Sequence, residues 1–268
     1  MSSILDKNPV IAKHVSDIAE VSGYLWERGW AERNGGNISV DLTDDLSTDD
    51  LKRMSLFTAD LPKPFPTLAG RCFYFTGTNR RMRDVAKGPL QHGAILRISA
   101  TGKQYYIIAD ETVIPTSEIA SHLTIHAYMR YVSRRNIRAV CHTHPTDLIA
   151  LSHNPSFLRE GALTKLLWSM LPEVRIVVPK GLGIVRYQHP GTIELANETI
   201  RQLTQHDCLL WEKHGCLAVG ESVIEAFDTI DTLSKAAQIY QTALSYGFVP
   251  EGISEENMEG LAQMFKLP

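Results

Sequence analysis

The chain has 268 residues, 44% of them hydrophobic, and its 27 lysines and arginines nearly balance 30 aspartates and glutamates. The length suffices for one or two domains, and the apolar share suffices for a substantial core. The net charge of -3 argues against a basic nucleic-acid-binding tail and a polybasic membrane patch. Any anionic ligand must therefore be held by a local site.

The cysteines, the N-terminus and the apolar runs all bear on the cellular compartment. The four cysteines include no CxxC pair and are sparse for a disulfide scaffold. The N-terminal "MSSILDKNPVIAKH" has no basic region followed by an apolar core and a cleavage site. No run approaches the roughly 20 apolar residues that span a bilayer. We therefore expect a cytoplasmic protein.

The N-terminal half predicts one helix followed by strands and turns. Apolar residues at helical spacing predict an amphipathic helix over residues 9–29, ended by Gly29, and "ERNGGNISVDL" predicts a glycine-rich turn that leads into a strand. The polar, proline-rich residues 43–68 predict a surface excursion. "RCFYFTGTNRRM" predicts a strand that ends in a Gly-Thr turn, and "GAILRISATGKQYYIIA" predicts a hairpin.

The C-terminal half mixes helices and strands. "IPTSEIASHLTIHAYMRYVSRR" predicts a helix capped by Ser117, with Glu118 in its first turn. "IRAVCHTH" and "EVRIVVP" predict strands, "LTKLLWSML" predicts a short helix, and "GLGIVRY" extends the second strand or bends away from it. "GTIELANETIRQLTQ" predicts a helix capped by Thr192, and "CLLWEKHGCLAVG" predicts a strand pair that turns at His214-Gly215. Helices over 222–246 and 254–266 complete the chain.

The elements indicate one α/β domain over residues 1–268, because no linker, repeat or low-complexity tract divides them. The sheet is expected to be mixed or largely antiparallel with helices on both sides. The dense hairpin signals argue against a purely parallel, doubly wound sheet.

The pair His142 and His144 closes the apolar strand "IRAVCHTH". Side chains alternate along a strand, so both imidazoles lie on one face and can converge on one ion. A catalytic zinc takes three protein ligands and keeps one position open. His214, at the end of "CLLWEKH", is the best candidate for the third ligand.

Other histidines offer an alternative. His122 and His126 have i, i+4 spacing on the predicted helix and could bind a metal as a pair, although the glutamate of a zincin motif is missing. The rest are expected in the core, on helix surfaces or in loops.

Two carboxylates are candidate proton donors or acceptors. Glu118 stands at a predicted helix start, where a partly desolvated glutamate can serve as an acid or base, or can simply complement the helix dipole. Glu173 precedes a predicted strand, where a solvated strand end is the plain alternative.

Three segments are candidate anion cradles, since turn amides and helix N-termini bind phosphate. None has P-loop or dinucleotide-fold spacing, and each is also compatible with an ordinary turn. These segments are "RNGGN" (33–37), "TGT" (76–78) and "PTSE" (115–118).

The ordered motifs "ERNGGNIS", "FTGT", "PTSE", "HTH", "WSMLPEV" and "WEKHG" resemble the class II aldolase/adducin family, over about residues 22–247. The resemblance implies a three-layer α/β/α class II aldolase fold with a mainly antiparallel central sheet, one Zn2+ per subunit and a cyclic homotetramer. It further implies the site residues: zinc ligands His142, His144 and His214, catalytic Glu118 and Glu173, and phosphate-binding Asn34, Asn37, Gly77, Thr78, Thr116 and Ser117.

The long insert before "RCFYFTGT" favours the rhamnulose branch of the family, which implies cleavage of L-rhamnulose 1-phosphate to dihydroxyacetone phosphate and L-lactaldehyde. Two departures are visible: Thr78 replaces a common serine, and "LWSMLPE" replaces "LWEGSTE", so that Pro172 stiffens the approach to Glu173. The alternatives are an L-fuculose or ribulose phosphate aldolase, a pentulose-phosphate 4-epimerase or a sugar-phosphate dehydratase. A non-catalytic adducin-like scaffold is the alternative from another class.

Overall fold

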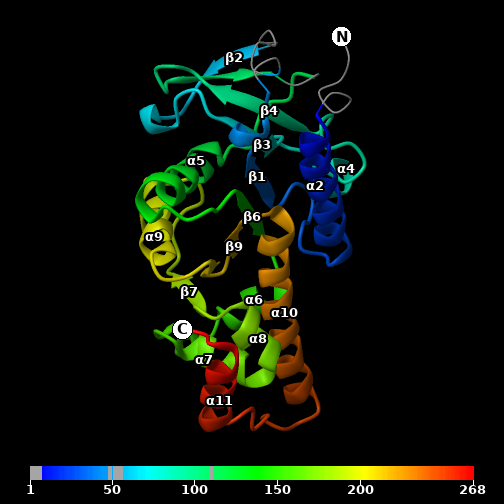
Figure 1. Ribbon diagram of the computed structural model, residues 1–268. Coiled ribbons are helices and arrows are strands. Elements are labelled where there is room, and N and C mark those ends of the chain that lie inside the picture. Colours follow the sequence, from blue (N-terminus) through cyan, green and yellow to red (C-terminus); the bar gives the residue numbers. More distant parts are fainter. Residues whose placement is uncertain (1–7, 48–49, 51–56, 109–110) are drawn as a thin grey trace. The chain divides into compact units, whose positions relative to one another are not determined.

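The computed structural model describes residues 8–47, 50, 57–108 and 111–268 (Figure 1). The chain divides into two compact units: unit 1 is Met1–Thr143 with Val219–Ile224, and unit 2 is His144–Ala218 with Glu225–Pro268. Among the described residues, no helix has both the length and the apolar character that a membrane span requires.

Unit 1 is built on antiparallel strands in the order β2-β5-β4-β3-β1-β6. Helices α5 and α2 lie on opposite sides of β1 (Figure 1). The elements are α2 (Pro9–Glu27), β1 (Asn37–Asp41), η1 (Thr43–Asp45), β2 (Phe57–Asp60), η2 (Pro66–Leu68), β3 (Cys72–Thr76), α4 (Met82–Val85), β4 (Gly93–Ile98), β5 (Gln104–Ile107), α5 (Ile119–Tyr128), a π-helical turn (Met129–Ser133) and β6 (Ala139–Thr143).

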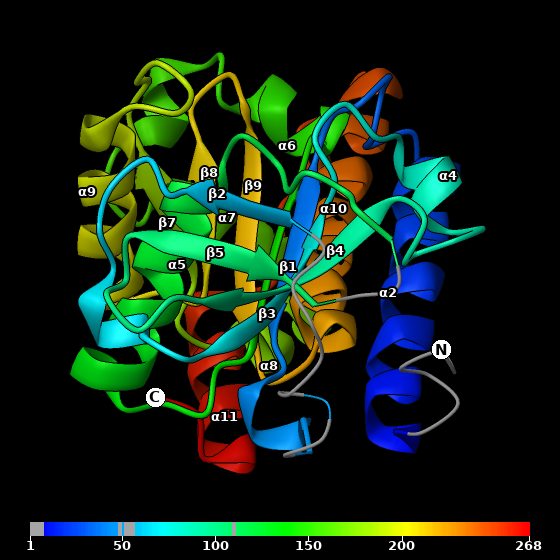
Figure 2. The same ribbon diagram turned by 90° about the horizontal axis from the view of Figure 1, so that it is seen from above.

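Unit 2 carries a smaller group of strands, in which β8 pairs with β9 antiparallel and with β7 parallel (Figure 2). Strand β9 ends in unit 1, where Arg138 N donates to Gly220 O at 2.9 Å. The elements are α6 (Thr146–Leu151), η4 (Pro155–Leu158), α7 (Ala162–Met170), α8 (Pro172–Val177), β7 (Leu182–Val185), α9 (Ile193–Leu203), β8 (Cys208–Trp211), β9 (Gly215–Gly220), α10 (Val223–Ser245) and α11 (Glu255–Phe265).

Most predicted elements are confirmed, including the α/β class, the mostly antiparallel sheet, the β4-β5 hairpin and the Thr192 cap of α9. The prediction of a surface excursion over 43–68 is wrong for its second part. There β2 pairs with β5, and the apolar side chains of Leu61, Phe65 and Leu68 are buried. Residues 48–49 and 51–56 of that segment lie outside the described residues.

The predicted strand "EVRIVVP" is also wrong, because residues 172–177 form helix α8. Pro172 takes the first helical position, where its fixed φ suits the helix and its missing N–H costs nothing. Arg175 stacks 4.3 Å from the ring centroid of Trp168 on α7. Packing against α7 and α11 therefore overrides the β-branched composition of the segment.

One face of β1 packs against α5 through polar side chains. Ser39 Oγ lies 2.7 Å from Nδ1 of His122 and 2.8 Å from Nε2 of His126. The side chain of Ser39 has no exposed surface, and both histidines are buried. Burial lowers the pKa of His122 to about 3 and that of His126 to about 4, so both imidazoles are neutral.

The next residue on this face, Asp41, is paired with Arg71 at 2.6 Å from Nη2. Burial alone would raise the pKa of Asp41, but His126, the hydroxyl of Thr43 and the Arg71 guanidinium outweigh it and lower the pKa. The carboxylate therefore stays charged although it is buried.

The buried imidazoles predict a loss of stability in mild acid. Because their folded pKa values lie below the ordinary 6.5, the unfolded chain binds more protons between about pH 6.5 and 4, and the free energy of unfolding falls as the pH falls through that range. Each histidine should lower the free energy of unfolding by about 1 kcal/mol as the pH falls from 7 to 5.5. Denaturant unfolding in chelator-containing buffer measures this, and His126→Gln should weaken the pH dependence. An identical dependence in wild type and variant would contradict the assignment.

Candidate functional site

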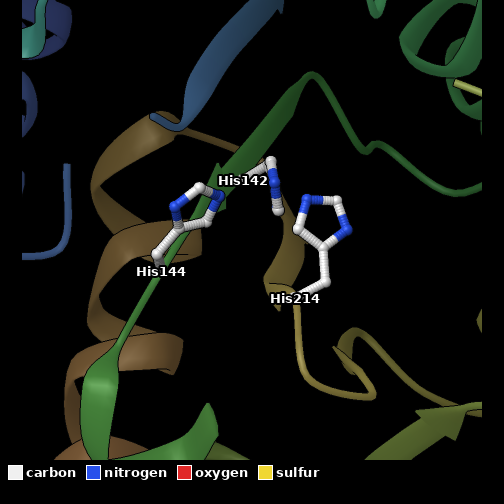
Figure 3. A group of neighbouring side chains, drawn as sticks. All are labelled: His142, His144 and His214. Atoms are coloured by element: carbon white, nitrogen blue, oxygen red, sulfur yellow. The ribbon is translucent and has the colours of Figure 1, made fainter. Parts of the chain in front are cut away.

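Three imidazoles gather at one place. One ring nitrogen from each of His142, His144 and His214 lies within 4.8 Å of the others (Figure 3). His142 is buried in β6, and His144 follows one residue beyond the strand end. Pro145 disfavours a helical backbone at His144 and so keeps the chain extended there. The alternation of side chains along β6 thus continues to His144, so that His142 and His144 lie on the same side of the chain.

The turn between β8 and β9 fixes the position of His214. Lys213 adopts a left-handed backbone with φ of 59°, and its N–H donates to Ser152 Oγ at 2.8 Å. The ring of Trp211 lies 5.1 Å from that of His214 by centroids, and Trp211 Nε1 donates to Thr199 at 3.1 Å. The imidazole is therefore packed against an indole that is itself held in place.

The donor set suits a divalent transition metal. Within the described part of the chain, these histidines are the one group of three or more potential ligands whose donor atoms come this close. Three imidazole nitrogens match the ligand count of a catalytic zinc, which leaves a fourth position for water or substrate. The alternative pair differs, since His122 and His126 both direct a nitrogen at the hydroxyl of Ser39.

Glu118 precedes α5 at its N-cap position and is half-buried. Its Oε2 accepts a hydrogen bond from Asn37 Nδ2 at 2.8 Å, and the Oδ1 of the same amide faces Nε2 of His122. Asn37 on β1 is the cross-strand partner of His142 on β6, so the two side chains share a face of the sheet. In unit 1, the carboxylate of Glu118 is therefore bonded to Asn37, which lies beside His142 on the sheet.

The sequence reasoning missed Ser39, which joins His122 to His126. Two spacings contain the signal: polar residues alternate along β1 at 37, 39 and 41, and polar residues recur every four positions at 118, 122 and 126. Neither pattern indicates a shared contact until β1 and α5 are known to pack together.

The prediction that Ser117 caps α5 is wrong, because Glu118 holds the N-cap position and no side chain caps the helix there. Thr116 Oγ1, and not Ser117, accepts a hydrogen bond from Glu118 N, at 3.3 Å. Ser117 is exposed and Thr116 is buried. The hydroxyl of Thr116 therefore holds the backbone at which the Glu118 side chain begins.

Two of the candidate cradles lie side by side. Gly77 and Pro115 form a β-bridge, Thr78 N donates to Ile114 O at 2.8 Å and Thr116 N donates to Thr76 O at 2.9 Å. The Gly77 N–H donates to a backbone carbonyl as well, at 2.8 Å. These amides are occupied, so a phosphate at this place would meet side-chain hydroxyls.

The third candidate, the glycine-rich turn, approaches β6 closely. A methyl group on Gly36, whose φ is 75°, would lie 2.8 Å from the carbonyl oxygen of His142. Asn34 is exposed in the same turn, whereas Asn37 is buried and bonded as described. Glycine is thus required here for close backbone packing.

Glu173 lies in the first turn of α8 and is exposed. The expected strand end is therefore a helix start, where the carboxylate complements the helix dipole.

The chain is similar to known sugar-phosphate aldolases. The chain is 46% identical to the rhamnulose-1-phosphate aldolase of Bacteroides thetaiotaomicron, over the full length of both chains. It is 34% identical to the rhamnulose-1-phosphate aldolase of Yersinia pestis, over 94% of this chain and 93% of that one. The crystal structure of a sugar-phosphate aldolase from Thermotoga maritima is similar with a TM-score of 0.78 and 32% identity, over 90% of this chain and 99% of that one.

The family model "Class II Aldolase and Adducin N-terminal domain" matches residues 16–241. This match takes in all three clustered histidines and Glu118. The class II aldolases depend on a metal, and the donor set described above suits one. The chain therefore belongs to the class II aldolase and adducin family.

Proposed function

We propose that this protein reversibly cleaves L-rhamnulose 1-phosphate to dihydroxyacetone phosphate and L-lactaldehyde. The observation that carries the proposal is the 46% identity, over the full length of both chains, with the aldolase of Bacteroides thetaiotaomicron. The clustered nitrogens of His142, His144 and His214 and the half-buried Glu118 supply the groups that such a reaction needs.

We propose zinc as the metal and the three clustered histidines as its ligands, because their donor set is that of a catalytic zinc. When bound, the metal would stabilise the negative charge that develops on the oxygens of the substrate as the carbon–carbon bond breaks. The chain's own residues then have to orient the substrate and move protons.

Glu118 is proposed as the acid and base at C3. In cleavage, the C4 hydroxyl loses its proton, the C3–C4 bond breaks and its electron pair is left on the C3 side, where Glu118 delivers a proton. In synthesis, the same carboxylate removes that proton. Asn37 already bonds Oε2, so Oε1 is the atom proposed to carry the proton. Glu173 is proposed to handle the proton on the aldehyde side.

The phosphate is proposed to bind near the paired turns, where the hydroxyls of Thr78 and Ser117 are the available donors. Asn34, Asn37, Gly77 and Thr116 complete the proposed surroundings. Holding the remote phosphate orients the reacting carbons. We further propose that the protein is a cytoplasmic homotetramer. Each active site would then include Glu173 from a neighbouring subunit.

The reaction can be tested with paired substrates. The purified protein should release dihydroxyacetone phosphate from L-rhamnulose 1-phosphate faster than from L-fuculose 1-phosphate, and a chelator should abolish both activities until zinc is returned. Faster cleavage of the fuculose substrate would transfer the assignment to that sister reaction. No cleavage of either would favour an epimerase or a non-catalytic scaffold.

Removal of one proposed ligand should remove metal and activity together. His144→Ala leaves two imidazoles, too few for a catalytic zinc site, so metal content measured by atomic emission and turnover should both collapse. His189→Ala, at an exposed position in unit 2, is the control and should change neither. A variant at His144 that keeps full metal and full turnover would refute this ligand set.

Glu118→Gln separates proton transfer from metal binding. The amide keeps the size of the side chain but cannot transfer the proton, so kcat should fall by about 10²–10⁴ while zinc content stays unchanged. Turnover close to that of the wild type would exclude Glu118 as the acid and base.

A further inference from the structure

Glu118 is the end of a line of side-chain hydrogen bonds that runs between β1 and α5. The line passes from Glu118 to Asn37, then to His122, Ser39 and His126. Residues 37 and 39 come from one face of the strand, and residues 118, 122 and 126 from one face at the start of the helix. Every link lies within unit 1.

The line is shielded from water. The exposed fractions are 7% for Asn37, 0% for Ser39, 1% for His122 and 2% for His126. Hydrogen bonds of this kind are electrostatically stronger than in water, and a broken one leaves a buried polar group without compensation. The side chains of the line are therefore held in one arrangement.

The chemistry of Glu118 sets the direction of every donor. Its Oε2 accepts from the NH2 group of Asn37, so the carbonyl oxygen of that amide is left for His122. His122 must then donate from Nε2, which leaves Nδ1 to accept from the hydroxyl of Ser39. Since that hydroxyl has one hydrogen, it accepts from Nε2 of His126. All the donors point from His126 toward Glu118.

We propose that Ser39 and His122, supported by His126, are positioning residues that lock the amide of Asn37 and so aim the carboxylate of Glu118. If the line broke, the Asn37 amide could flip and turn its carbonyl oxygen toward the carboxylate, which would repel it. This inference rests on the proposed role of Glu118. It also gives Asn37 a task other than phosphate binding, one that acts on turnover and not on substrate affinity.

The first test measures kcat, KM and zinc content in line-breaking variants. Ser39→Ala removes one buried hydroxyl together with its hydrogen bonds to His122 and His126, and should lower kcat about tenfold, in line with the modest net value of such bonds. His122→Leu should lower kcat about 10²-fold, as expected for a misplaced catalytic group. His122→Gln, which can both donate and accept, should recover part of the loss. In all three, KM and zinc content should stay close to those of the wild type.

Thr124→Val is the matched control. Its hydroxyl lies on the same helix and donates to Ala120 O at 2.7 Å, outside the line. Removing that hydroxyl should leave kcat unchanged. Equal kcat in Ser39→Ala, Thr124→Val and the wild type would overturn the proposal, as would a loss in Ser39→Ala expressed only in KM.

A double-mutant cycle separates positioning from general damage to the fold. In the Glu118→Gln background, His122→Leu should cause no further loss of kcat, because it acts through a carboxylate that is already gone. Independent, multiplying losses would overturn the proposal.

The last measurement does not depend on activity. Nitrogen-15 spectra of histidine side chains should find both His122 and His126 protonated on Nε2 at pH 7. Protonation of His122 on Nδ1 would reverse the line and overturn the proposal. A wild-type protein that is inactive on every sugar phosphate but has these tautomers would refute the proposed function and leave the hydrogen-bond line intact.

Discussion

The line of hydrogen bonds between β1 and α5 depends on a match between the residue spacing of a strand and that of a helix. Two residues of a strand advance about 6.6–6.8 Å, and four residues of a helix advance about 6.0 Å. Positions 37, 39 and 41 of β1 can therefore follow positions 118, 122 and 126 beside α5 with less than about 1 Å of drift per step. This correspondence lets short polar side chains bridge the two elements repeatedly, and each bridge named above follows from it.

Burial gives this polar contact its direction. Charged imidazoles would donate from both nitrogens and could not accept from Ser39, whereas neutral ones each present one donor and one acceptor. Because burial lowers the pKa of both His122 and His126, the histidines remain neutral even though Asp41 lies near. The carboxylate of Asp41 also accepts hydrogen bonds from Nε and Nη2 of Arg71, which supplies a positive partner without a proton on the imidazoles. The imidazoles of the line are thus uncharged at neutral pH.

Local patterns predicted most of the fold and the metal-site candidates, because both depend on short-range periodicity. Alternation in "AVCHTH" places His142 and His144 on one side, and the hairpin at "WEKHG" predicts the turn that holds His214. The failures arise where distant contacts decide: α8 is a helix because it packs against α7 and α11, and residues 57–60 form a strand because β5 supplies their partner. The role of Ser39 could not be predicted for the same reason, since its partners lie 83 and 87 positions away in the sequence.

The glycines of the candidate cradles mainly allow the backbone to pass close to neighbouring atoms. Gly36 lets the turn touch the carbonyl of His142, and a methyl group on Gly77 would lie 2.6 Å from the side chain of Val113. The amides of Gly77, Thr78 and Thr116 are consumed in holding the turns together. These three amides are therefore not available to form a phosphate-binding nest of the P-loop kind. Recognition of a phosphate here would have to come from hydroxyl groups, of which Thr78 carries one.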